Sequence, residues 1–581
     1  MKNLMYLLLL TSIIFTSCEK TIVDPPAPPV GGNLSNDIVR DTTFKKGVYV
    51  IDGTIRVRNA TVTIEPGTVF RFTDGSAFDV AYWSDEEAAI IAKGTKDQPI
   101  LFTSNSSSPS NSSWDGFRFF HGTHNTVFDY CTFEYGGGSS SYSMIYMDDC
   151  PASFSNCHIQ KTAGIAVRVI NGAYFDMFQG NVLNEIESYP MEVYADQVHT
   201  ISGSNSFTTS LGILIPNDQD FDKQGDFTWS NQGVPYYVEG TIRFGAEGTG
   251  SVLHIAKGTE IRFMESAQWD VAYWDNKFAS IIAEGTADEP IVFTSASLAP
   301  SAGDWKSINL FEGTINTSFD HCVFKYGGKQ DYYDMLYVQD ASVGVTNCQF
   351  SHAKNNAIWL DRAAMFSAFG GNTFSDNGGY SIAIRPNYVH TIIGENVYDA
   401  MGIFITNDGD LDIKGAYTWT NQNTPYTIEG QMRVGAQAPG VQLTIEPGTM
   451  IKFYEGAKID LAYSSDEYAS LIADGTAAEP IIFTSAKPVP NSGDWKGIWF
   501  NEGTSNCVIN NCIIDYAGND VGWDGALYLD DAGSPLTLSN TLISNSGSNG
   551  ISVDGDDHGS SVDYSNNVTF QNIAGVDYYV R

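Results

Sequence analysis

Two related segments place a tryptophan beside a carboxylate. The sequence Asp-Val-Ala-Tyr-Trp ends at Trp83, with Asp85 two residues further on, and it ends again at Trp274, which Asp275 follows directly. A flat aromatic ring next to a carboxylate suits stacking against a sugar and hydrogen bonding to its hydroxyls. We therefore predict glycan contact through Trp83, Asp85, Trp274 and Asp275. The alternative is that these rings cover a seam between successive turns of the fold.

Two acidic runs carry carboxylates at alternate positions, as the opening of a calcium loop does. They hold Asp218, Asp220 and Asp222, and Asp408, Asp410 and Asp412. Hard cations bind where several oxygens converge, so the runs predict a possible Ca²⁺ site. Further along, Lys223 stands where a calcium loop has glycine, and Trp229 and Trp419 stand where it has glutamate. A solvated acidic turn is therefore the alternative, and no cofactor is required.

The only candidate for catalysis lies near the C-terminus. A glycoside hydrolase needs two or three facing carboxylates. The sequence Asp554-Gly555-Asp556-Asp557-His558-Gly559 is similar to the acid cluster of polygalacturonase-like hydrolases, but the Arg-x-Lys element of that family is missing. We interpret the segment as a polar turn and name no catalytic residue.

Six of the cysteines after Cys18 fall at equivalent or nearly equivalent places of a repeat described below. Cys131 and Cys157, like Cys322 and Cys348, are 26 residues apart. In an exported protein such pairs could form disulfides, or they could be buried thiols that fill small apolar spaces. Thr541 stands where Cys512 would have its partner. No Cys-x-x-Cys pair occurs, so no zinc site is predicted.

The N-terminus has the layout of a secretory signal. An apolar run from Leu4 to Phe15 is too short to span a bilayer as a helix, and small residues then lead to Cys18. This resembles the lipobox of bacterial lipoproteins, with Phe15 in place of the usual leucine. The resemblance implies a signal peptide over 1–17 and acyl chains on Cys18 that anchor the protein in the outer membrane, facing outward. The alternative is an ordinary cleaved signal followed by an unmodified cysteine.

Three passages of the chain align almost without gaps. The segment Thr-Ile-Glu-Pro-Gly-Thr around Gly67 corresponds to segments around Gly258 and Gly448, and Trp114 corresponds to Trp305 and Trp495. The offsets are 191 and then 190 residues each time. We therefore expect a tether and N-terminal cap over 18–50, then units over 51–240, 241–430 and 431–581, the last ending in a C-terminal cap.

Within each unit the residues alternate with period two. Cys131, Phe133 and Tyr135 alternate with Thr132 and Glu134, which predicts short strands with the first set packed inward. Asparagines recur about 25 positions apart, and we expect them to stack in successive coils; they are Asn156, Asn181, Asn347, Asn372, Asn540 and Asn567. This spacing favours a solenoid over separate sandwiches.

These motifs resemble the right-handed parallel β-helix proteins of the pectin-lyase-like group. Bacterial surface lipoproteins of this type share the pattern Gly285-Thr286, Pro290-Ile291-Val292-Phe293-Thr294-Ser295 and Gly303-Asp304-Trp305. The resemblance implies an all-β solenoid, about 100 Å long from the spacing of stacked strands. It covers lyases, hydrolases and adhesins alike, so it fixes no activity.

The net charge of the chain limits which molecules it can bind. Lys and Arg number 31 against 68 Asp and Glu, a net charge of −37, which argues against nucleic acid and against direct binding of anionic surfaces. We expect a non-catalytic surface lipoprotein that binds a polysaccharide or a surface protein and touches the membrane only through its anchor. The alternatives are a polysaccharide lyase or glycoside hydrolase, and a structural spacer.

Overall fold

The computed structural model describes residues 31–138, 143–217, 220–329, 334–519, 525–533, 535–554 and 562–580. Strands make up nearly all regular structure in these parts. Two short 3₁₀ helices interrupt them, η1 (Ala195–Thr200) and η2 (Pro386–Thr391). No helix of the described residues is both long and apolar enough to cross a bilayer.

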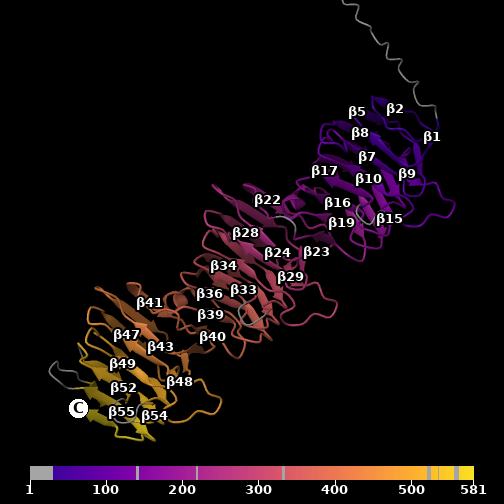
Figure 1. The fold of residues 1–581 in the computed structure, drawn as a ribbon. Helices are drawn as coiled ribbons and strands as arrows, with labels where there is room; N and C mark the ends of the chain where they lie inside the picture. Colours follow the sequence, from indigo (N-terminus) through magenta and orange to yellow (C-terminus); the bar gives the residue numbers. More distant parts are fainter. Residues whose placement is uncertain are drawn as a thin grey trace, which may run out of the picture.

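A full coil consists of three short strands, and η1 and η2 each take the place of the second strand in one coil. In the first repeat these are β4 (Thr54–Val57), β5 (Ala60–Ile64) and β6 (Val69–Phe72), and the chain then returns to β7 (Ala77–Val80), β8 (Ala88–Lys93) and β9 (Ile100–Ser104). Within each sheet a strand pairs in parallel with its counterpart one coil later, until the sheet ends, as it does at β17 (Tyr174–Gln179); Thr54, for example, lies beside Ala77. The chain is a right-handed parallel β-helix, as predicted, and Figure 1 shows it as a long rod.

The rod begins before residue 51. The strands β1 (Gly32–Leu34), β2 (Thr42–Phe44) and β3 (Val48–Ile51) precede the first full coil. They already extend two of its sheets, because β1 pairs with β3 and β3 with β6, while β2 pairs with β5. The residues expected to form an N-terminal cap thus add strands to two sheets of the β-helix.

The rod steps sideways at each boundary between repeats. We number the three strands of a coil by their order along the chain, so β4 is in first position and β6 in third position. The sheet that begins with the first-position strand β4 runs through β23 (Tyr236–Val238). It then continues with the third-position strands of the next repeat, beginning with β26 (Glu260–Phe263), to give one 13-stranded sheet. The first-position strands of that repeat start a new sheet at β24 (Thr241–Phe244), and the same change recurs before β43 (Gln431–Val434). In Figure 1, β7, β24 and β43, one strand from each of these three sheets, accordingly lie in three successive segments of the rod. Equivalent strands of the three repeats, such as β4, β24 and β43, therefore lie in three different sheets.

The core follows the predicted alternation within the strands. Cys131 and Phe133 are buried, Thr132 and Glu134 are more exposed, and Trp114, Trp305 and Trp495 are fully buried. Each of these indoles stacks on a phenylalanine of the preceding coil; Trp305 and Phe263 have ring centroids 4.4 Å apart. Tyr135 departs from the pattern because its backbone φ is 65°, a left-handed conformation that ends the strand and leaves the ring half-buried.

The asparagine ladder is real but shifted by one residue. Asn181 accepts a hydrogen bond from the Cys157 backbone N–H at 2.9 Å, and its own N–H donates to the Asn205 side chain at 3.1 Å. The register places Cys157, not Asn156, beside Asn181. Asn156 instead adopts the left-handed turn conformation and donates to Asp129. The expected stacking of Asn156 on Asn181 is therefore wrong, whereas Asn181 and Asn372 do act as ladder residues.

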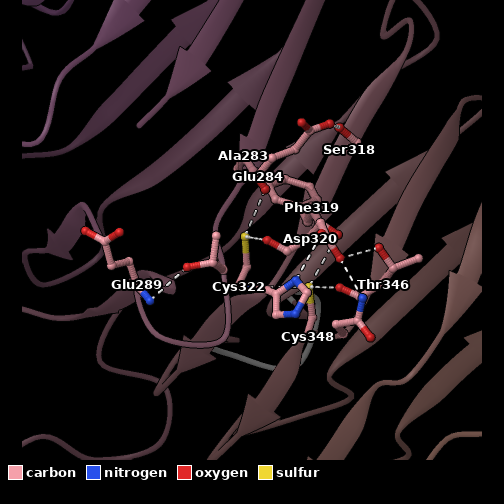
Figure 2. Close-up of polar contacts among 12 residues, drawn as sticks. Ala283, Glu284, Glu289, Ser318, Phe319, Asp320, Cys322, Thr346 and Cys348 are labelled. Carbon is pink, nitrogen blue, oxygen red and sulfur yellow. Dashed lines mark hydrogen bonds and ion pairs between the residues drawn. The ribbon is translucent and has the colours of Figure 1, made fainter. Parts of the chain in front are cut away.

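The seven described cysteines are buried free thiols. Figure 2 shows Cys322 and Cys348, whose sulfurs lie over backbone carbonyls: the Cys322 thiol donates to Ala283 O at 3.2 Å and the Cys348 thiol donates to Thr346 O at 3.1 Å. The Cys322 N–H donates to the Cys348 sulfur at 3.4 Å. Of the two interpretations, the structure has the apolar filler rather than the disulfide.

Candidate functional site

The predicted tryptophans lie in exposed aromatic pairs. Tyr82 and Trp83 pack edge to face with ring centroids 4.7 Å apart, and Tyr273 and Trp274 do the same at 4.8 Å. Trp83 is 51% exposed and Trp274 is 54% exposed. In the third repeat Tyr463 is exposed and Ser464 takes the tryptophan's place. We call the exposed aromatics of each repeat the aromatic shelf: Tyr82 and Trp83, Tyr273 and Trp274, and Tyr463.

A strained residue turns the chain outward just before each shelf. Ala81, Ala272 and Ala462 have φ angles of 51°, 56° and 51°, a left-handed conformation that is costly for a residue with a Cβ. Each follows a first-position strand, respectively β7, β27 (Gln268–Val271) and β46 (Lys458–Leu461). The same backbone turn recurs in all three repeats, so each repeat presents its shelf from the same local geometry.

A glycine of the next coil makes room for this turn. A Cβ on Gly122, Gly313 or Gly503 would fall within 2.0 Å of a backbone carbonyl oxygen of the shelf loop. The loop itself closes with a backbone hydrogen bond, from Glu86 N to Trp83 O at 3.0 Å in the first repeat. The shelf is thus built on a tightly packed base.

An arginine lies against the rings of each shelf. The guanidinium carbon of Arg56 is 5.3 Å from the Tyr82 ring centroid, that of Arg243 is 5.4 Å from Tyr273 and 5.7 Å from Trp274, and that of Arg433 is 4.2 Å from Tyr463. These distances are those of cation–π contacts. Each arginine side chain remains between 35% and 41% exposed, so it is open to a ligand.

Carboxylates of the preceding coil hold the arginine in place. Arg243 Nη1 lies 3.7 Å from Asp220 Oδ1, and Arg433 Nη1 lies 3.9 Å from Asp410 Oδ2. In the first repeat the backbone N–H of Arg56 donates to Asp37 Oδ1 at 3.1 Å, and the backbone N–H of Arg433 donates to Asp410 Oδ1 at 3.2 Å. The central carboxylate of each predicted acidic run thus supports the arginine.

A second aspartate lies beneath each arginine and is almost fully buried. Asp79, Asp270 and Asp460 are at most 2% exposed and pair in register with Arg56, Arg243 and Arg433. Their other partners differ: Arg118 contacts Asp79, Asn309 donates to Asp270 at 2.7 Å, and Lys458 lies 2.7 Å from Asp460. Burial raises the pKa of Asp79 and of Asp270 above the usual range, although their donors oppose it. No ligand can reach these carboxyls. Asp79 lies 3.7 Å from Arg56 and Asp270 lies 3.9 Å from Arg243, so these two carboxyls help to hold their arginines.

In the second repeat the two predicted sites meet in one cavity. Asp220, Asp222, Arg243, Tyr273, Trp274 and Lys277 line a space of about 140 Å³. Sequence reasoning treated the aromatic pair and the acidic run as separate sites. They come together because Phe221, between the two carboxylates, bridges to Phe244 at the end of β24, next to Arg243.

The remaining predicted residues lie apart from the arginines or outside the described parts. Asp85 is exposed and lines a cleft of about 410 Å³ with His121, while Asp275, Asp408 and Asp412 are exposed. Asp412 accepts a hydrogen bond from the Asn387 side chain at 2.7 Å. Asp218, Cys18 and residues 555–559 of the candidate catalytic turn lie outside the described residues. Calcium binding stays a prediction; within the described ranges, no group of three or more His, Cys, Asp or Glu is placed to hold a metal ion.

Sequence reasoning missed the arginine and the tyrosine of the shelf. Arg56, Arg243 and Arg433 stand at equivalent places of the three repeats, as do Tyr82, Tyr273 and Tyr463. Their recurrence was the available signal, since surface positions elsewhere vary between the repeats.

The fold and these surface sites define the class of protein: a right-handed parallel β-helix with a repeated aromatic and arginine surface. Residues 35–139, 223–335 and 412–504 match the family model of the pectate-lyase-like beta helix domain. These segments make up more than half of the chain, so the protein belongs to that family. No curated protein sequence matches the chain significantly.

Proposed function

We propose that the protein binds polysaccharide on the cell surface through its aromatic shelves and does not cleave it. The observation that supports this most directly is the threefold recurrence of an exposed aromatic group against a partly exposed arginine. Nothing in core packing requires exposed rings at equivalent places, whereas sugar binding uses both parts: the rings cover the apolar face of a sugar, and the arginine donates to its hydroxyls.

The electrostatics favour a neutral polysaccharide. With a net charge of −37 the protein repels polyanions at long range, and the shelf arginines are already paired with carboxylates. An acidic pectin-like chain would therefore need bridging cations. A neutral chain needs none.

The shelf carboxylates do not suit catalysis. The buried aspartates cannot contact a substrate, and Asp220 and Asp410 are paired with arginine. General acid catalysis needs a carboxyl that reaches the glycosidic oxygen, together with a second one facing it. A lyase or hydrolase remains the second candidate because the family model bears the name of a lyase fold.

Three shelves on one rod would act together. When one shelf holds a polysaccharide, the other shelves meet the same chain at high effective concentration, so modest affinities combine into long retention. The proposal includes an acylated Cys18 and a proline-rich tether that presents the rod outside the outer membrane. A spacer without ligands would need no such surface.

A glycan array followed by product analysis tests this proposal. The purified protein is expected to be retained by at least one neutral polysaccharide without forming new reducing ends or unsaturated products. The variant with Trp83→Ala and Trp274→Ala should lose most retention, while Tyr174→Ala, which removes an exposed ring from another face, should keep it. Product formation by the purified protein would make it an enzyme, and full retention by the double variant would exclude the shelf.

A further inference from the structure

A larger pocket lies where the second repeat begins, on a different sheet from the shelves of the second and third repeats. It has a volume of about 540 Å³, within the range of small-molecule sites. Its floor comes from β23 and β26 of the 13-stranded sheet that crosses from the first repeat into the second. Its rim is the loop after β29 (Ile291–Ser295), which projects from the rod in Figure 1.

One wall of the pocket is apolar. The rings of Tyr189 and Tyr237 pack edge to face with centroids 5.5 Å apart, and Met264 and Leu298 extend this wall. Arg262 fixes Tyr237 from behind, since its Nη1 donates to the Tyr237 hydroxyl at 2.9 Å. Leu298 is fully exposed at the rim, and Tyr189 is half-buried.

The opposite wall is polar and charged. Lys329 Nζ donates to Glu265 Oε1 at 2.8 Å and to Ser266 Oγ at 2.7 Å. Partial burial favours a higher pKa for Asp304, but hydrogen bonds from Ser295 and Ser301, with the nearby Lys329 charge, outweigh it and lower that pKa. The wall therefore presents a fixed carboxylate beside a fixed ammonium group at neutral pH.

The corresponding place at the second boundary carries larger aromatic side chains at two positions. Tyr454 stands where Met264 does, and its hydroxyl lies 2.7 Å from that of Tyr380, the equivalent of Tyr189. Phe404, in place of Leu214, stacks on Tyr380 at 4.9 Å. Lys487 then bridges Glu455 and Asp494 at 3.1 and 2.9 Å. Larger aromatic side chains thus stand at two positions of this framework at the second boundary, whereas Thr427 replaces Tyr237 there.

We propose that this open pocket, here called the boundary pocket, binds a single pyranose ring of a polysaccharide chain. A pyranose has an apolar C–H face and a hydroxyl edge, which match the tyrosine wall and the Asp304–Lys329 wall. A wholly apolar ligand would leave the charged wall without polar contacts, and a strong anion would face Glu265 and Asp304. The inference rests on the proposed glycan binding and adds one site that the repeats do not share.

Titration with neutral hexasaccharides of glucose, xylose and mannose tests the boundary pocket, with a galacturonate hexamer as the acidic probe. In a background with Trp83→Ala and Trp274→Ala, one neutral hexamer is expected to bind. Met264→Tyr, which introduces the residue found at the second boundary, should weaken this binding at least tenfold. The control Met365→Tyr makes the same change at an exposed position of β37 (Met365–Gly370) and should have no effect.

Tyr189→Ala provides a second variant that opens the pocket instead of filling it, and it should cause a comparable loss. Binding unchanged by both variants, binding of the galacturonate hexamer alone, or no binding of any hexamer would overturn the pocket. If the protein with intact shelves still binds polysaccharide in those cases, the proposed function stands without the pocket. If Met264→Tyr and Tyr189→Ala weaken polysaccharide binding but the shelf substitutions do not, the shelf proposal fails instead.

Discussion

Replacing Asn372 by alanine should weaken one coil of the rod by an amount that can be worked out from its contacts. Asn372 is 1% exposed and bridges neighbouring coils. Its Oδ1 accepts from the Cys348 N–H at 2.9 Å, and its Nδ2 donates to Val345 O at 2.9 Å. Alanine leaves both backbone groups buried and unpaired, at a cost of about 1–3 kcal/mol each, or about 2–6 kcal/mol in total.

Hydrogen exchange reports this loss where it occurs. In a solenoid each coil depends mainly on its neighbours, so the opening free energy should fall in the peptides around Cys348 and much less in the first repeat. Thr373→Ala is the control, since Thr373 is exposed on β38 (Thr373–Ser375) and its loss should cost about 0.5 kcal/mol. Exchange around Cys348 that is the same in both variants would refute the account of the ladder.

Three further outcomes follow from buried groups. Trp305→Ala should lower the free energy of unfolding by about 3–5 kcal/mol, because it empties a fully buried site stacked on Phe263; a change in urea stability below about 1 kcal/mol would contradict this packing. Burial raises the pKa of Asp334 to about 7. Between about pH 4 and 7 the folded state therefore holds a proton that the unfolded chain has lost. The free energy of unfolding of the native protein, relative to that of Asp334→Asn, should fall by at most about 4 kcal/mol as the pH rises from about 4 to 7. Urea titrations that show the same pH dependence for both proteins would count against this prediction. In a chain with Cys18→Ala, a thiol reagent should modify none of the seven described cysteines until the protein is denatured and all seven afterwards; fewer than seven would indicate disulfides.

The sequence predicted well what depends on local alternation and on the repeat. The strands, the inward Cys131 and Phe133 and the core position of Trp305 follow from period two, because neighbouring coils repeat the same environment. The prediction that Asn156 stacks on Asn181 failed because these two asparagines have different structural roles, although they recur at the same spacing. One occupies a left-handed turn and the other bonds along the ladder, and spacing alone does not separate them.

The sideways step and the arginine contacts depend on geometry that the pattern does not contain. The step arises where β21 (Ile213–Ile215) and β23 pair directly with each other and a new sheet opens at β24. It brings Asp220 to within 3.7 Å of Arg243, 23 positions away. The recurrence of the arginine was visible in the sequence, but which carboxylates would hold it was not.

The central claim is that the aromatic shelves bind polysaccharide, and it is tested most directly by measuring retention as a function of the number of intact shelves. Residence time on an immobilised neutral polysaccharide is compared among proteins with three, two, one and no shelves, made by combining alanine substitutions at Tyr82 and Trp83, at Tyr273 and Trp274, and at Tyr463. The account predicts that each removed shelf shortens residence in a distinct step of about tenfold or more. A protein without shelves that is retained as long as the native one would contradict it.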